Sequence, residues 1–210
     1  MKNIGNIIRI GFLCLFLFLL AEGKIVFWLI LYGISLIAAI VFGRIYCGYI
    51  CPMNTLMLPT ELISKKLGIQ TGNRPKWLGE GYFTWIALIA SVAVMLLFKK
   101  LLNINVPVLP FWLAVSVIVT LKYKPAVFHN LICPFGALQK VFGGFTKHSE
   151  TVEQESCMGC GICVRVCGND AVKVSQARGK AVIDPALCCQ CTNCQKACPV
   201  TAIHYRSKRR

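Results

Sequence analysis

The sequence is poor in charged side chains, and above all in acidic ones. Only 15% of its 210 residues are charged, and 23 lysines and arginines stand against 8 aspartates and glutamates. Histidine is scarce too: none of the three lies within a long apolar run, which excludes a membrane haem held by two histidines. The sequence also lacks a recognisable nucleophile–base pair and a glycine-rich nucleotide loop. These shortages argue against a hydrolase, a nucleotide-dependent enzyme and a membrane cytochrome.

Apolar residues are in excess. They make up 56% of the chain, which is too apolar for an ordinary soluble domain and predicts membrane spans. We expect four transmembrane helices, over Ile4–Ala21, Ile25–Gly43, Tyr82–Phe98 and Val106–Leu121. No convincing cleavage site follows the first run, so we expect a retained helix rather than a signal peptide.

The basic residues predict an orientation. With the N-terminus in the cytoplasm, most lysines and arginines up to and including Lys147 lie on the inner side, and the outer turns carry only Lys24, Lys99 and Lys100. This is the bias that membrane proteins show. We therefore expect a multi-pass protein of the inner membrane with both termini in the cytoplasm. The formal charge of +15 is interpreted as membrane orientation and attraction to anionic lipid. Nucleic-acid binding by the tail Arg206–Arg210 is disfavoured because no nucleic-acid motif accompanies it.

The C-terminal part carries a duplicated cysteine pattern. A set of four cysteines, separated by two, two and three residues, occurs twice. The first set begins at Cys157 and the second begins 31 positions later, at Cys188. Three closely spaced thiolates can each bind one corner of an iron–sulfur cube, while the fourth binds the other cube. Cluster one is assigned to Cys157, Cys160, Cys163 and Cys198. Cluster two is assigned to Cys188, Cys191, Cys194 and Cys167.

Zinc sites and disulfides fit this pattern less well. Zinc sites usually combine one Cys-x2-Cys pair with a distant second pair. A disulfide framework needs an oxidising compartment and an export signal. Cys189 is an additional cysteine, interpreted as a small buried residue, with exchange of ligand role with Cys188 as the alternative. The segment from about Glu155 to Tyr205 resembles the bacterial two-cluster ferredoxins, although Gly168 stands where that family usually has proline.

Two further elements combine cysteine with proline. They are Cys47-x3-Cys51-Pro52, which follows the second expected helix, and His129-x3-Cys133-Pro134, which follows the fourth. Proline suits the first position of a helix, which places the preceding cysteine at a helix N-terminus, where thiolate and metal binding are favoured. Two interpretations stay open. The cysteines could be packing residues, or Cys47, Cys51, His129 and Cys133 could form one redox or metal site.

With these elements the resemblance covers the whole chain. The stretch Gly43–Pro52 and the stretch from Cys133 to Gly136 are similar to the membrane ferredoxins of the NapH and NosR type, in which His129 would usually be cysteine. That resemblance implies electron transfer between quinol or other donors and partner reductases or maturation systems. A quinol dehydrogenase and a copper or iron reductase or assembly factor are the alternatives.

The expected organisation has two domains. Residues 1–150 would form the four-helix membrane domain, with both Cys-Pro elements at its cytoplasmic face and a linker near its end, over Thr146–Ser156. Residues 151–210 would form a small α+β ferredoxin domain with two [4Fe-4S] clusters and a basic tail. The expected partners are the membrane, a redox partner protein and quinol, and no nucleic acid.

Overall fold

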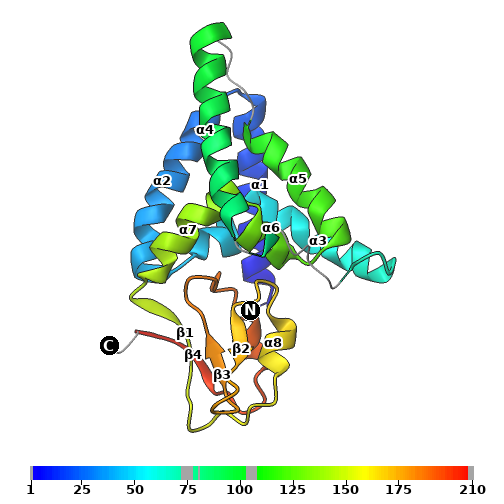
Figure 1. Ribbon diagram of the computed structural model, residues 1–210, viewed down its shortest axis with the longest axis vertical. Coiled ribbons are helices and arrows are strands. Elements are labelled where there is room, and N and C mark those ends of the chain that lie inside the picture. The colour runs from blue at the N-terminus through cyan, green and yellow to red at the C-terminus, as the bar shows by residue number, and fades with distance from the viewer. Residues whose placement is uncertain (1, 72–77, 80, 103–107, 208–210) are drawn as a thin grey trace. The chain divides into compact units, whose positions relative to one another are not determined.

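The structure is a computed structural model that describes residues 2–71, 78–79, 81–102 and 108–207 (Figure 1). Two parts of the sequence predictions lie outside the described residues. They are the start of the fourth apolar run, at Val106 and Pro107, and the end of the basic tail, Lys208–Arg210.

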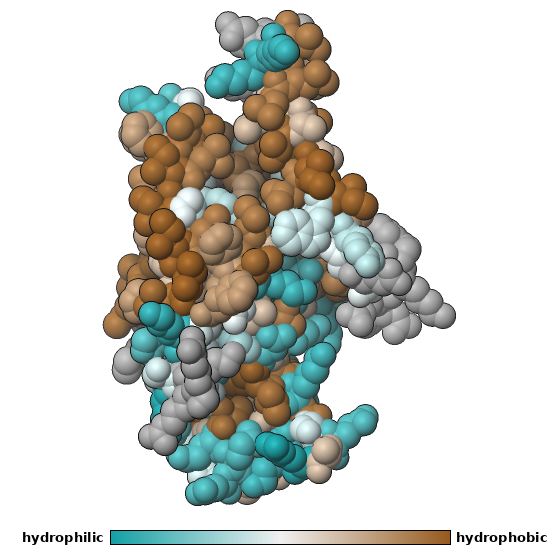
Figure 2. All heavy atoms as spheres, turned by 60° about the vertical axis from the view of Figure 1, so that its left-hand side comes forward, coloured by the Kyte–Doolittle hydropathy of each residue, from teal (hydrophilic) through white to brown (hydrophobic). Residues whose placement is uncertain are grey.

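Three helices among the described residues are long and apolar enough to cross a membrane. They are α1 (Lys2–Ala21), α2 (Ile25–Phe42) and α4 (Tyr82–Leu102). Many of their large apolar side chains point outward, for example Ile37 with 69% exposure and Ile89 with 67%. Figure 2 shows the resulting hydrophobic surface over the long helices. Side chains of this kind on a long helix face are suited to lipid, so this is a membrane protein.

The fourth apolar run forms a shorter helix. Helix α5 (Val108–Lys122) has 15 residues, and at about 1.5 Å per residue it is shorter than a bilayer core of roughly 30 Å. The fourth span therefore stays a prediction. The turn between α1 and α2 is as expected, with Gly23 in the left-handed region at φ 68°, where glycine carries no steric penalty.

The described chain divides into two compact units, Met1–Cys51 with Gln139–Arg210, and Pro52–Leu138. The second unit holds α3 (Pro52–Lys66), α4, α5, α6 (Pro125–Leu131) and the start of α7 (Pro134–Gly144). Inside it α3 packs along α5, and the Ser64 hydroxyl donates to the Leu121 carbonyl at 2.5 Å. The Trp112 indole N–H donates to Ser91 Oγ at 3.0 Å, which ties α5 to α4.

The first unit contains α1, α2, a π-helical turn η1 (Tyr46–Ile50), the end of α7 and the ferredoxin domain. That domain has four strands, β1 (His148–Val152), β2 (Val172–Val174), β3 (Ala181–Ile183) and β4 (Ile203–Ser207), and two short helices, α8 (Ile162–Val166) and α9 (Asn193–Ala197). Strand β1 pairs antiparallel with β4, from His148↔Ser207 to Val152↔Ile203. Strand β2 pairs antiparallel with β3, with Val172 opposite Ile183. The expected small α+β domain is present.

The structure repeats the 31-residue offset of the sequence. Helix α8 and helix α9 begin 31 residues apart, and so do β2 and β4. The core between the halves is small, with Val172, Ala181 and Ile203 buried among cysteines. A core of this size rarely stabilises a domain by itself, so the bound clusters are part of its stability.

The segment expected to be a linker is instead structured. Strand β1 lies inside Thr146–Ser156. Residues beside this strand and on its partner β4 cap the C-terminal end of α2. The Lys147 N–H donates to the Ile40 carbonyl at 3.0 Å, the Thr146 hydroxyl to Val41 at 3.2 Å, and the Tyr205 hydroxyl to Phe42 at 3.3 Å. The last carbonyls of a helix have no hydrogen-bond donor within the helix. Here residues of the ferredoxin domain supply the donors. Polar composition alone could not distinguish this strand from a linker.

Candidate functional site

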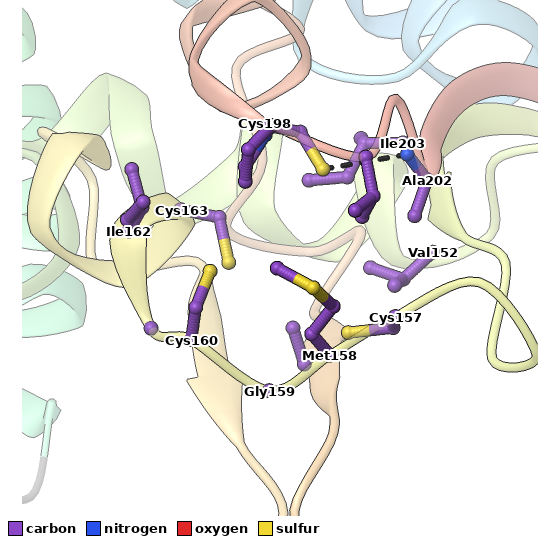
Figure 3. Close-up of a pocket in the computed structure, with 14 residues that line it drawn as sticks. Val152, Cys157, Met158, Gly159, Cys160, Ile162, Cys163, Cys198, Ala202 and Ile203 are labelled. Atoms are coloured by element: carbon purple, nitrogen blue, oxygen red, sulfur yellow. Dashed lines mark hydrogen bonds between the residues drawn. The ribbon is translucent and has the colours of Figure 1, made fainter.

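Four cysteines from both halves of the ferredoxin domain line one cavity. Its walls include Cys157, Cys160, Cys163 and Cys198, together with apolar residues such as Ile203. In Figure 3 the sulfur atoms of Cys160 and Cys163 lie side by side at this cavity, and the Met158 side chain extends into it. The structure thus brings together the four residues that the sequence assigned to cluster one, including Cys198 from the other half.

The backbone around this cavity leaves room only for glycine at one point. Gly159 has φ 71°, and a Cβ added there would overlap the carbonyl oxygen of Gly179. A set of four thiols in an apolar cavity is the donor set that an iron–sulfur cluster requires. The residues present therefore fit a [4Fe-4S] cluster.

The fourth cysteine of each set accepts a backbone hydrogen bond. The Ala202 N–H donates to Cys198 Sγ at 3.3 Å, and the Ala171 N–H donates to Cys167 Sγ at 3.3 Å. The two bonds are related by the 31-residue offset. Donors aimed at a sulfur stabilise its thiolate form and the negative charge of a reduced cluster.

The second set of cysteines is also assembled. Burial, together with the neighbouring Cys191 and Cys167, raises the pKa of Cys188 to about 12. The pKa of Cys194 is raised by burial and by the same neighbours. Cys167 therefore lies near Cys188, Cys191 and Cys194, and their binding of one common cluster stays a prediction. Since ligating thiols must be deprotonated, cluster binding at these sites releases protons.

Cys189 is buried beside this set. A hydrogen bond from the Cys189 thiol lowers the pKa of Cys191 to about 6, and the same bond raises the pKa of Cys189. Cys189 is thus the small buried residue that the sequence suggested, and it also donates to a sulfur of the cluster-two set.

The Cys-Pro elements begin helices, as predicted. Pro52 follows Cys51 and starts α3, and Pro134 follows Cys133 and starts α7. The Gly136 N–H donates to Cys133 Sγ at 3.4 Å, which places that sulfur at the N-terminus of α7. In the first element Arg44 donates to Cys47 Sγ at 3.7 Å. His129 is buried, with a ring nitrogen 3.1 Å from Asn54 Oδ1.

Whether these elements bind metal stays a prediction. Among residues 2–71, 78–79, 81–102 and 108–207, no group of three or more His, Cys, Asp or Glu side chains is placed to hold a single metal ion. Cys47 and Cys51 belong to the first compact unit, and His129 and Cys133 belong to the second.

Sequence reasoning missed three buried polar residues of the first unit. Arg44 is fully buried, and Glu150 and Gln190 are nearly so. Arg44 was visible only as a charge close to Cys47. The duplication could have singled out Gln190. It lies 31 residues after Gly159, at a position where the first half of the domain needs a glycine. Nothing in the sequence around Glu150 marks it as buried.

Comparison with known proteins agrees with this geometry. A family model described as "4Fe-4S binding domain" matches twice, at residues 25–70 and 105–151, and so covers both Cys-Pro elements. A second model, "4Fe-4S dicluster domain", matches residues 156–202. The fold and the site therefore define a membrane iron–sulfur protein with two [4Fe-4S] clusters in a dicluster ferredoxin domain.

The relatives refine this class. The chain is 26% identical to the ferredoxin-type protein NapH of Haemophilus influenzae, over 83% of this chain and 66% of that protein. It is 24% identical to the putative electron transport protein YccM of Escherichia coli, over 80% of this chain and 52% of the relative. It is 32% identical to the methylamine utilization ferredoxin-type protein MauN of Methylobacillus flagellatus, over 60% of this chain and 48% of that protein.

The chain spans about half to two thirds of the length of these relatives. No solved structure matches it. Both family models and these relatives are consistent with a polyferredoxin of the NapH type.

Proposed function

We propose that this protein is a membrane-anchored electron carrier. It takes single electrons from a quinol or a cytoplasmic donor and passes them to a partner reductase or maturation complex. The observation that carries the proposal is the cysteine cavity built from both halves of the ferredoxin domain, in a chain that also has three membrane-capable helices. Each [4Fe-4S] cluster supplies a one-electron site when bound.

The residues of the chain have defined tasks in this proposal. The first three cysteines of each set and the fourth cysteine of the other set hold one cluster each. The Ala171 and Ala202 N–H groups, which donate to Cys167 and Cys198, stabilise the charge of the electron. Helices α1, α2 and α4, with α5 as a fourth span, anchor the chain in the inner membrane, with both termini in the cytoplasm.

The experiment uses full-length protein, loaded anaerobically with iron and sulfide and placed in proteoliposomes. A reduced menaquinone analogue is added, and the visible iron–sulfur absorbance is followed, with dithionite as the reference for full reduction. For a carrier whose donor is a cytoplasmic protein, we expect dithionite to bleach both clusters, while the quinol alone bleaches little. A preparation with far fewer than about eight irons per chain would overturn the proposal.

A quinol dehydrogenase is the alternative that the same experiment separates. The oxidation of one quinol releases two electrons and two protons, and two one-electron clusters could accept that pair. Bleaching of both clusters by the quinol alone would move the protein to that class.

We also propose, from residue chemistry and the repeated family match, that the Cys-Pro elements bind metal. Cys47, Cys51, His129 and Cys133 supply thiols and one imidazole, which suit iron, copper or zinc. The test compares the total metal of wild type with that of Cys51→Ala and Cys133→Ala. Cys14→Ala, on the exposed side of α1, is the control. Unchanged metal content in both variants would assign these cysteines to packing.

A further inference from the structure

The two cysteine sets differ in what covers them. The η1 turn packs directly on the loop of cluster two. Gly48 lies so close to this loop that an added Cβ would overlap the carbonyl oxygen of Cys189. Next to it the Tyr49 hydroxyl donates to the Gln190 carbonyl at 3.2 Å. The loop that carries Cys188 and Cys191 is thus fixed to the segment that follows α2.

Two arginines strengthen this contact. Arg44 donates to the Ala186 carbonyl at 3.1 Å and, with its other terminal nitrogen, to Cys47 Sγ at 3.7 Å. One guanidinium therefore joins the first Cys-Pro element to the chain two residues before Cys188. Arg9 of α1 donates to the Gly48 carbonyl at 2.8 Å and lies over the Tyr49 ring, 5.3 Å from its centroid.

Gln190 completes the attachment from the other side. Its side-chain amide donates to Ser149 Oγ at 3.0 Å, and its amide oxygen accepts from the Glu150 N–H at 3.1 Å. A Cβ added to Gly43 would fall 2.5 Å from the Gln190 side-chain nitrogen. The cluster-two loop is therefore held both by β1 and by the residues around the end of α2.

Cluster one has a more open surface. Cys160 is exposed, whereas Cys188 and Cys194 are buried. Met158, between two of its ligands, is 63% exposed, and Val164 on α8 is 36% exposed. Arg165 is exposed on the same helix, and Arg178 precedes the Gly179 carbonyl that contacts Gly159. This surface combines apolar side chains with positive charge.

We propose that cluster two is the membrane-side cluster of the electron path and that cluster one exchanges electrons with a partner protein. The partner presents an acidic surface with an apolar centre, complementary to the exposed face around Met158 and Arg165. This proposal rests on the proposed function, because it assigns the two ends of the same path. The first Cys-Pro element stands at the membrane end, and Arg44 joins it to Ala186, two residues before the cluster-two ligand Cys188.

The first test measures the approach of solvent to each cluster. Fully loaded protein in detergent is reduced with dithionite, and a neutral gadolinium chelate is added as a relaxation probe. The two electron paramagnetic resonance (EPR) signals are assigned with the matched variants Cys160→Ser and Cys191→Ser. We expect the chelate to increase the relaxation rate of the cluster-one signal several-fold more than that of cluster two. Equal effects, or a stronger effect on cluster two, would overturn the proposal.

The second test disturbs the contact itself. Gly48→Ala places a methyl group against the Cys189 carbonyl, so we expect it to change the cluster-two signal and leave that of cluster one unchanged. Tyr49→Phe removes only the hydrogen bond to Gln190 and serves if the alanine variant does not fold. Gly33→Ala is the control, because an added Cβ there meets nothing within 4 Å. Changes confined to cluster one would contradict the assignment.

Both tests use chemical reduction, so they read the two clusters whether or not any quinol reacts. Failure of the proposed function would appear as missing clusters. Failure of this inference would appear as two intact clusters with the wrong accessibility.

Discussion

Gln190 takes the place in the second half of the ferredoxin domain that Gly159 takes in the first. The two residues are 31 positions apart, and both have left-handed backbones, with φ 57° and 71°. Glycine adopts this conformation freely, whereas another residue pays roughly 1–2 kcal/mol. The glutamine is retained at a strained position because its side chain bonds β1, which a glycine could not do.

We predict that Gln190→Ala destabilises the first unit by about 1–3 kcal/mol. The variant keeps the left-handed backbone but leaves the buried Glu150 N–H without its acceptor, which is the penalty of an unmade hydrogen bond. The measurement is the temperature at which the cluster-two EPR signal is lost. Gln195→Ala on α9 is the control. Equal loss temperatures for wild type and Gln190→Ala would contradict the prediction.

Ligand exchange between the halves gives a second prediction. Cys198→Ala should remove cluster one, although Cys198 lies in the second half, and Cys167→Ala should remove cluster two. In each variant the iron content should fall from about eight to about four per chain. The EPR signal that remains in Cys198→Ala should match that of Cys157→Ala. If it matched that of Cys188→Ala, the two assignments would be wrong.

The third prediction concerns Cys189, whose thiol donates to Cys191. Cys189→Ala removes a donor to a ligating sulfur and so destabilises the reduced state of cluster two. A hydrogen bond of about 1 kcal/mol corresponds to a fall of roughly 40 mV in a one-electron potential. The measurement is a redox titration followed by EPR, with the cluster-one signal as the internal reference. A fall of equal size in both potentials would contradict the role of Cys189.

The fourth prediction concerns pH. Burial, and then the nearby Cys191, raises the pKa of Glu150, and neither of its carboxylate oxygens has a hydrogen-bond partner among the described residues. The native state thus favours the neutral acid. Its stability contribution is complete below the unfolded pKa of about 4.3 and is lost as pH rises through the higher native value.

Wild type should therefore lose stability relative to Glu150→Gln over that range, by at most roughly 1.4 kcal/mol per pH unit. Thermal unfolding in detergent from mildly acidic to alkaline pH measures the difference. Glu153→Gln is the control, because Glu153 lies at the surface, 3.6 Å from Arg206. A difference between wild type and Glu150→Gln that does not change with pH would contradict the prediction.

Much of the site was predictable because its chemistry is local. The cysteine spacing alone predicted that Cys198 would join Cys157, Cys160 and Cys163, and all four line one cavity. Proline at the first position of α3 and α7 followed from the missing N–H of that residue. Apolar runs predicted α1, α2 and α4, although α4 continues through Lys99 and Lys100 to Leu102, beyond the predicted end at Phe98.

What could not be predicted depends on contacts between distant segments. Strand β1 forms because β4, more than 50 residues later, supplies its partner. The π-helical turn at Tyr46–Ile50 and the burial of Arg44 depend on carbonyls such as that of Ala186, which no local pattern reveals. Polar residues in such places resemble a solvated linker until the partner is known.

The capped end of α2 has a consequence for biogenesis. The groups that bond Ile40, Val41 and Phe42 come from Lys147, Thr146 and Tyr205, and the last of these lies 163 residues after Phe42 in the chain. The second helix therefore leaves the ribosome long before the groups that complete its end, and that end is finished only when the ferredoxin domain folds. We therefore expect iron delivery to the ferredoxin domain and the final ordering of the N-terminal hairpin to be coupled.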